Sequence, residues 1–417
     1  MKTNPSPLVI TGLGLMTGLG VNLADSWQGL IAGKSVTAPF RNLDPARLSC
    51  PFGVELPQAA DALFQSHIKK RKRSQMTRST QIGLLTAEMA IADAQLDMER
   101  LDRSRIGVIL GSTGTSYVPG EVGKEEMRIL KNMPNAPVSW ISLNWKLHGP
   151  SFIIGTACSS GVYAMGAAYG LIRSGQCDVV LCGSVDSSLN YPDIEGFCDL
   201  LALAEATGDP ATASRPFDAK RSGFVIGEGG GILVLESLDH ARRREARIYA
   251  QMHYPGFYTE SYNILSPEPD GKGMAGCMQR ALQESGLTLG DIDYINAHGT
   301  STNLNDLYET LAIKTVFADR AHEIPVSSTK SMTGHCLAGS GGVEAVISCK
   351  ALYEGIIPPT INLTHPDPRL DLDYVPLQAR EKDLRHVMSN SFAFGGHNGV
   401  NIFSAYDHLR REGEERP

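Results

Sequence analysis

The stretch at 155–161, GTACSSG, places a cysteine between an apolar run at 151–154 and a segment of helical spacing at 161–172. At a strand-to-helix junction, the free backbone N–H groups and the helix dipole favour negative charge, so we expect a lowered pKa for the Cys158 thiol. Small neighbours leave space for a substrate. A buried structural cysteine is the alternative interpretation. The position of Cys158 at this junction favours a nucleophilic thiol.

Two polar loops each carry a histidine. His298 follows an apolar strand in NAHGTST at 296–302, and His335 ends STKSMTGH at 328–335. Either histidine alone is more typical of a residue whose hydrogen bonds are satisfied than of a catalyst. Together with a cysteine at the end of a strand, they form a set suited to acyl transfer.

A lysine and a glutamate accompany the second histidine. Lys330 precedes His335 in a Ser/Thr/Gly loop and is either a surface lysine or a buried cation that orients water or a carboxylate. Glu344 falls on an apolar helical segment at 341–353, where a carboxylate is costly unless it is paired. We therefore expect Lys330 to be the partner of Glu344.

The last glycine-rich loop, NSFAFGGHNG at 390–399, is suited to a close approach of its backbone. Such a loop can direct an N–H at a developing oxyanion while Phe394 covers the cleft. The alternative is a tight hairpin beside the last strand, 400–403, in which Phe394 contributes to stability alone.

Strands and helices alternate along the chain. This order predicts an α/β architecture with layered sheets, built from two similar halves at 1–249 and 250–417. The expected strands are 7–14, 105–112, 178–183, 223–236 and 294–297, and the expected helices are 23–33, 80–95, 273–286, 305–317 and 341–353.

The composition is that of a soluble globular enzyme, with 417 residues, 42% hydrophobic and 20% charged. The net charge of -7 argues against a general nucleic-acid binder. No apolar run approaches the roughly 20 residues that cross a bilayer, and 1–7 lacks the features of a signal peptide, so we expect a cytoplasmic protein without a membrane contact. The eight cysteines show no CxxC pair or zinc-like spacing, which predicts free thiols and no metal site.

A dense basic run interrupts this acidic chain. Consecutive cations would repel one another unless a polyanion binds to them. A small acidic carrier protein is the partner we expect. A solvated helix face is the alternative. The run consists of Lys69, Lys70, Arg71, Lys72 and Arg73.

Taken together, these segments resemble the elongating β-ketoacyl carrier-protein synthases of the thiolase-like superfamily, which serve fatty acid and polyketide synthesis. The resemblance runs from about residue 7 to 403 and rests on GTACSSG, SRPFDAKRSGFVIGEGGGILVLE, NAHGTST, SSTKSMTGH and NSFAFGGHNG in the family's order. It implies a five-layered α-β-α-β-α fold and a homodimer, with a heterodimer with a related chain as the alternative.

The resemblance also implies roles for particular residues. Cys158 matches the nucleophile that takes the acyl chain from the phosphopantetheine of an acyl carrier protein, and no other cofactor is implied. His298 and His335 match the pair that supports decarboxylation of the malonyl extender and holds its enolate. The backbone N–H groups of Cys158 and Phe394 match the oxyanion hole. Phe394 also matches the gate, and Thr300 and Thr302 match the pantetheine contacts.

The chain departs from the family pattern at several positions. His397 stands where threonine is common and Ala393 where glycine is common, while Thr113 takes an apolar position at the base of the acyl pocket. The stretch Tyr117–Asn135 does not match the usual dimer face and tunnel wall. These departures leave open a bulk fatty acid pathway or a specialised polyketide or polyene pathway. They also motivate a second hypothesis, a non-catalytic partner subunit, resembling a chain-length factor, that shapes the tunnel of a sister synthase.

Overall fold

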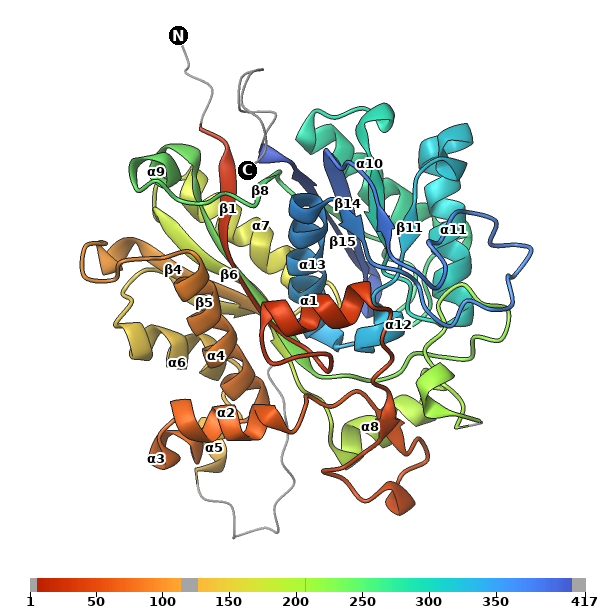
Figure 1. Cartoon of the computed structure of the whole chain (residues 1–417), viewed down its shortest axis with the longest axis horizontal. Coiled ribbons are helices and arrows are strands. Elements are labelled where there is room, and N and C mark those ends of the chain that lie inside the picture. Colours follow the sequence, from red (N-terminus) through yellow and green to blue (C-terminus); the bar gives the residue numbers. More distant parts are fainter. Residues whose placement is uncertain (1–5, 114–126, 207, 407–417) are drawn as a thin grey trace.

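The computed structural model of the chain describes residues 6–113, 127–206 and 208–406 (Figure 1). The part of the unmatched stretch that lies at 117–126 is therefore outside the described residues. No helix in the described ranges combines the length and apolar character needed to cross a membrane.

The N-terminal strands form five neighbours of one sheet in the order β5-β4-β6-β7-β1. The first three run parallel, and β7 is antiparallel to both of its neighbours. Near-continuous apolar runs form β1, β4 and β6 because these strands are covered on both faces. The strands are β1 (Leu8–Met16), β4 (Ile106–Gly111), β5 (Ser151–Ile154), β6 (Val179–Asp186) and β7 (Gly229–Ser237).

The C-terminal strands repeat this pattern in the order β11-β10-β14-β15-β8. Again the first three are parallel, and β15 is antiparallel to both neighbours. An antiparallel pairing of β8 with β1 joins the two sets, and β9 (Gly256–Thr259) adds to β15. The same strand order and direction in both sets agree with two related halves. The strands are β8 (Ala250–Met252), β10 (Tyr294–Asn296), β11 (Val326–Ser327), β14 (His386–Phe392) and β15 (His397–Ser404).

Helices lie between and outside these two sets of strands (Figure 1). The core around α7 (Ser160–Arg173) and α13 (Ser340–Glu354) packs both helices against strands of both sets. The opposite face of the N-terminal strands carries α4 (Arg78–Asp93) and α6 (Ala136–Trp145). The C-terminal strands carry α10 (Lys272–Ser285) and α11 (Asn303–Phe317). This layering is the α-β-α-β-α arrangement expected from the sequence.

Three glycines bring the central helices and a strand into backbone contact. A Cβ at Gly161 of α7 would lie 2.7 Å from the backbone N of Gly342 in α13. A Cβ at Gly342 would in turn lie 2.3 Å from the carbonyl oxygen of Gly231 in β7. Only glycine permits this approach, which sets the distance between the residues at the N-terminal ends of α7 and α13.

The predicted elements agree with the structure to within a few residues, except that the run 223–236 becomes a strand only from Gly229. The boundary expected between residues 249 and 250 stays a prediction. The remaining elements are α1 (Leu23–Ile31), β2 (Ala38–Pro39), β3 (Phe52–Gly53), α2 (Ala59–His67), α3 (Lys70–Arg73), α5 (Arg128–Lys131), α8 (Tyr191–Asp199), α9 (Leu238–Arg243), α12 (Lys330–Thr333), β12 (Ile356–Ile357) and β13 (Arg380–Glu381).

Candidate active site

Cys158 lies in a strained turn between β5 and α7. Ala157 has a φ of 49°, a left-handed conformation that is costly for a residue with a Cβ. The hydroxyl of Ser160 holds the turn, because its Oγ accepts from the backbone N of Thr156 at 2.9 Å and donates to the carbonyl of Ala157 at 2.6 Å. The turn presents the cysteine at the N-terminal end of α7, as the sequence predicted.

His335 contacts the thiol. Its Nε2 lies 3.2 Å from the Sγ of Cys158, and its Nδ1 lies 2.9 Å from the Oγ of Ser340. A hydroxyl both donates and accepts, so Ser340 supports either tautomer of the ring. With the proton on Nδ1, Nε2 accepts from the thiol; with the proton on Nε2, the ring donates into the site. Sequence reasoning missed Ser340, whose only local signal is its place at the start of α13.

His298 completes the cluster. Its ring centroid lies 5.4 Å from that of His335 at an interplanar angle of 85°, and one ligand atom from each of Cys158, His298 and His335 lies within 4.8 Å of the others. All three side chains are buried, with exposed fractions of 6%, 2% and 3%, respectively. Residues far apart in the chain therefore converge on one point.

Lys330 and Glu344 form a buried ion pair, which confirms the predicted pairing. The Nζ of Lys330 also lies 3.4 Å from the Nδ1 of His298. The second carboxylate oxygen of Glu344, Oε2, has no hydrogen-bond partner among the described residues. The ammonium therefore lies between a carboxylate and an imidazole, where it disfavours a second positive charge.

Burial sets the protonation states of the cluster. It raises the pKa of the Cys158 thiol to about 12, a change that the nearby Lys330 opposes but does not reverse. The expected lowering of this pKa was wrong, because the sequence does not reveal how completely the sulfur is desolvated. Burial, followed by the charge of Lys330, holds the pKa of His298 and His335 well below its ordinary value, so both rings are neutral at pH 7. Burial also raises the pKa of Glu344 to about 7.

A cavity of about 330 Å³ opens onto the cluster. Besides Cys158 and the two histidines, its lining includes the predicted substrate contacts Thr300 and Thr302, whose hydroxyl oxygens lie 2.9 Å apart. Thr113 is not among the described lining residues. Its Oγ1 donates to the carboxylate of Asp186 at 3.1 Å, and its expected place at the base of an acyl pocket stays a prediction.

The glycine-rich loop is both a hairpin and a wall of the cavity. It joins the antiparallel strands β14 and β15, and Phe394 lines the cavity beside Ala393. The neighbouring segment fixes the loop, since the backbone N of Gly395 donates to the carbonyl of Ile264 at 2.7 Å. His397 lies edge-on to Tyr163, with ring centroids 6.4 Å apart. The two interpretations of this loop are therefore compatible, and the oxyanion hole stays a prediction.

The loop that carries His298 is fixed by Glu309, a residue that sequence reasoning missed. Its fully buried carboxylate accepts from the backbone N of His298 at 2.9 Å, from that of Gly299 at 2.8 Å and from the Nδ2 of Asn390 at 3.0 Å. Glu309 lies within α11, where a glutamate has the sequence character of a solvated position. Only the long-range contacts reveal its role.

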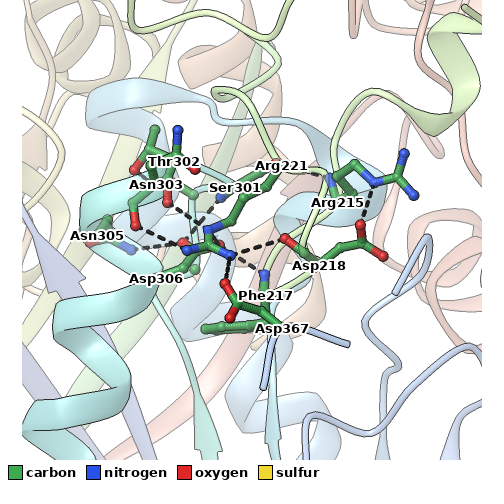
Figure 2. Close-up of polar contacts among 12 residues, drawn as sticks. Arg215, Phe217, Asp218, Arg221, Ser301, Thr302, Asn303, Asn305, Asp306 and Asp367 are labelled. Atoms are coloured by element: carbon green, nitrogen blue, oxygen red, sulfur yellow. Dashed lines mark hydrogen bonds and ion pairs between the residues drawn. The ribbon is translucent and has the colours of Figure 1, made fainter. Parts of the chain in front are cut away.

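A second missed group lies around Arg221, in the motif SRPFDAKRSG (Figure 2). The buried guanidinium donates to Asp367 at 3.0 Å and to the carbonyls of Thr302 at 3.2 Å and Asn303 at 3.1 Å, and it lies 3.8 Å from the carboxylate of Asp306. Asp306 also accepts from the backbone N of Phe217 at 2.8 Å. This network joins three distant segments at the start of α11, next to the cavity.

The basic run forms α3 and the residue before it. Lys69, Lys70, Arg71 and Lys72 are exposed, whereas Arg73 is half-buried and donates to the carbonyl of Phe64 at 3.4 Å. In Figure 1, α3 lies at the lower left and α11, which borders the cavity, at the right. Docking of a carrier protein at this run stays a prediction.

A layered α-β-α-β-α fold in which a buried cysteine meets two neutral histidines defines a thiol-dependent condensing acyltransferase. Family models agree: residues 6–241 match the β-ketoacyl synthase N-terminal domain and residues 249–364 its C-terminal domain. The chain therefore belongs to the β-ketoacyl synthase family and is a condensing enzyme.

Relatives cover nearly the whole chain. It is 39% identical to a 3-oxoacyl-[acyl-carrier-protein] synthase 2 of Synechocystis sp., over 96% of this chain and 98% of the relative. It is 37% identical to a protein of the same name from Coxiella burnetii, over 95% and 98%. Among solved structures, the ishigamide ketosynthase/chain length factor superimposes with a TM-score of 0.87 at 31% identity, covering 97% of this chain and 100% of that one. A type II polyketide synthase ketosynthase solved with its acyl-carrier protein gives 0.86 at 30% identity, covering 96% and 100%.

Proposed function

We propose that this chain condenses a malonyl extender with an acyl chain held as a thioester on Cys158, with both substrates delivered by an acyl carrier protein. The observation that carries this proposal is the 3.2 Å contact between the Sγ of Cys158 and the Nε2 of His335, beside a second neutral histidine. The acyl carrier protein is part of this proposal because the names of relatives include it and because one similar ketosynthase was solved in complex with an acyl-carrier protein.

The first half-reaction is transfer of the acyl group. As the Sγ of Cys158 attacks the thioester carbonyl, the Nε2 of His335 takes the thiol proton, and the backbone N–H groups of Cys158 and Phe394 stabilise the oxyanion. Collapse of the tetrahedral intermediate breaks the bond to the pantetheine sulfur, which takes the proton from His335. The carrier leaves with a free thiol.

The second half-reaction is decarboxylation and condensation. Loss of CO₂ from the malonyl group leaves an enolate, whose oxygen accepts hydrogen bonds from His298 and His335. Burial, and then the charge of Lys330, lower the pKa of His298 and keep it neutral, so the ring acts as a hydrogen-bond donor and not as a competing acid. The enolate carbon then attacks the acyl carbonyl and expels the sulfur of Cys158. One proton from solvent restores the thiol.

Acylation of Cys158 is the direct test. The protein is incubated with acyl carrier proteins bearing different chains, and the mass of the peptide containing residue 158 is measured, with Cys158→Ala as the control. We expect a mass increase only in the unsubstituted protein. No transfer from any chain length would contradict the proposal. Replacement of His335 by alanine should abolish malonyl decarboxylation while leaving some acylation.

We propose a dimer as the working assembly. The terminal strand β5 has no neighbour on its outer side among the described strands, and Phe152 on it is 38% exposed, so a second chain could extend the sheet there. A homodimer is the first expectation, and a heterodimer with a related chain is the second, since one similar structure is a ketosynthase/chain length factor. Sedimentation alone and with the related chain distinguishes them. Retained product formation by Cys158→Ala in such a complex would instead assign this chain the partner-subunit role.

The pathway and primer belong to the proposal as well. Relatives include 3-oxoacyl-[acyl-carrier-protein] synthases by name, and a type II polyketide synthase ketosynthase is similar by structure. Ranking acylation rates for carrier-bound primers of different length and unsaturation would separate a bulk fatty acid enzyme, which prefers saturated chains, from a specialised one, which prefers polyene or oxygenated chains.

A further inference from the structure

Four leucines surround the outer end of the catalytic cavity. Residues that line a cavity and are also exposed must lie where the cavity meets solvent, whereas the reactive residues at its inner end are buried. Leucines at this mouth come from three segments: the end of α8, the segment before α10 and the start of α11. They are Leu200, Leu201, Leu265 and Leu304, with exposed fractions of 47%, 88%, 36% and 44%. We call them the leucine rim.

Leu201 is the most exposed member of the rim and has an unusual backbone. Its φ is 52°, a left-handed conformation that is unfavourable for a branched side chain. A leucine that is 88% exposed gains almost no burial in the isolated chain to offset this strain. Such a residue indicates a function that is fulfilled only when something covers it.

The mouth also lacks basic groups. Among the described residues that line the cavity, none is lysine or arginine, and the charged side chain present, Glu260, accepts from the Nδ2 of Asn398 at 2.8 Å and from the backbone N of Glu268 at 2.8 Å. The described lining of this mouth therefore offers a partner leucine side chains and no lysine or arginine. The basic run at 69–73 lies on another part of the molecule (Figure 1).

We infer that the leucine rim binds an apolar face of the carrier protein around the point where its pantetheine arm emerges. This inference rests on the proposed function, because a substrate tethered to a carrier can reach Cys158 only if the carrier lies over the cavity mouth. Exposed apolar patches that surround an opening are typical of protein-binding sites, and a few central side chains carry most of the affinity. The long-range attraction and the final contact would thus come from different surfaces.

The test is Leu201→Gly. Glycine adopts a φ of 52° without strain, so we expect an unchanged or higher melting temperature for this variant. Leu377→Gly is a matched control, since Leu377 is also exposed, at 48%, has a φ of 66° and is not among the described lining residues. Leu201→Asn is a second variant, since asparagine also tolerates this conformation and presents a polar side chain.

Transfer to Cys158 is measured with an acyl carrier protein and with a small acyl-pantetheine thioester. For Leu201→Gly and Leu201→Asn we expect the KM for the carrier substrate to rise about fivefold, the loss typical of a contributing interface residue, with no change for the small thioester. Leu377→Gly should change neither. Equal losses with both substrates would show that the rim holds the arm or acyl chain and would overturn the inference, as would no change with either.

Failure of the proposed function would give a different result. In that case the unsubstituted protein would not be acylated by either substrate, whereas failure of the rim inference leaves acylation of the unsubstituted protein intact.

Discussion

The Sγ of Cys158 and the Nε2 of His335 lie 3.2 Å apart, although the two residues come from opposite halves of the chain. The thiol is desolvated, and its pKa of about 12 means that it is protonated at rest. The nucleophile is therefore formed when the imidazole takes the proton during attack, and not beforehand.

Alkylation of Cys158 by iodoacetamide should be slow at pH 7 and should rise about tenfold per pH unit up to pH 9, because the thiolate fraction is far from saturation. The experiment uses a Cys198→Ser background, since the half-buried Cys198 would also react. Rates are read by mass spectrometry at residue 158. His335→Ala should slow acylation of Cys158 by carrier substrates relative to the unsubstituted protein. A rate that reaches a plateau below pH 8 would show a preformed thiolate and contradict the prediction.

Malonyl decarboxylation should stay constant as the pH falls from 8 to 6. Both histidines act as neutral donors, and their pKa values lie well below the ordinary 6.5, so protonation through pH 6.5 does not occur. The rate is measured as release of CO₂ from a malonyl-carrier substrate at a concentration that saturates the enzyme. A rate that halves near pH 6.5 would show an unshifted histidine in the rate-limiting step.

Removing the buried ion pair should make the rate of malonyl decarboxylation fall at acid pH. In Lys330→Met combined with Glu344→Gln, no unpaired charge is left behind; burial still lowers both histidine pKa values, but the cation that lowers them further is gone. We expect the decarboxylation rate to decline at a higher pH than in the unsubstituted protein. The single variant Lys330→Met should in addition lose stability, because Glu344 remains buried without its partner. Identical pH profiles for the double variant and the unsubstituted protein would contradict the electrostatic role of Lys330.

Arg221→Met should destabilise the chain by about 3–5 kcal/mol, because Asp367 and two backbone carbonyls lose their buried donor and Asp306 loses its nearby positive charge. Arg221→Lys should rescue only part of this loss, since an ammonium cannot reproduce the planar guanidinium contacts. Urea unfolding measures both. Arg100→Met is the control: Arg100 pairs with Asp97 at the surface, and its loss should cost less than about 1 kcal/mol. Equal unfolding midpoints for Arg221→Met and Arg100→Met would refute the structural role.

Reversing charge at Lys69, Lys70 and Lys72 should raise the KM for carrier-bound substrates and spare small thioester mimics. The effect should shrink as salt is added, because it depends on long-range attraction. Reversal at Arg242 and Arg243, an exposed basic pair on α9, is the matched control. If α9 and α3 variants behave alike, net charge alone and not the run at 69–73 would be responsible.

The sequence predicted residues that the structure brings together at one cavity, because each lies in a loop after an apolar strand, where small and polar residues have few purely structural reasons to gather. Cys158, His298, His335 and the pairing of Lys330 with Glu344 were all found from such local signals. The fold followed from the alternation of strands and helices, together with the family resemblance.

The supporting residues could not be found in this way. Glu309 and Asp306 lie on α11 with the spacing of ordinary polar helix positions, and their burial depends on segments that are distant in sequence. The same reason explains the wrong pKa direction for Cys158, because desolvation depends on what covers the turn.

Gly161, Gly342 and Gly231 have a consequence for the design of inactive variants. A single methyl group at position 342 would act as a wedge between the two halves of the molecule, since it would meet the carbonyl oxygen of Gly231 at 2.3 Å. The sulfur and the imidazole sit on opposite sides of that seam, so an alanine there would disable proton transfer while every reactive atom remained present. The spacing that the reaction needs between sulfur and imidazole thus depends on positions that admit no side chain.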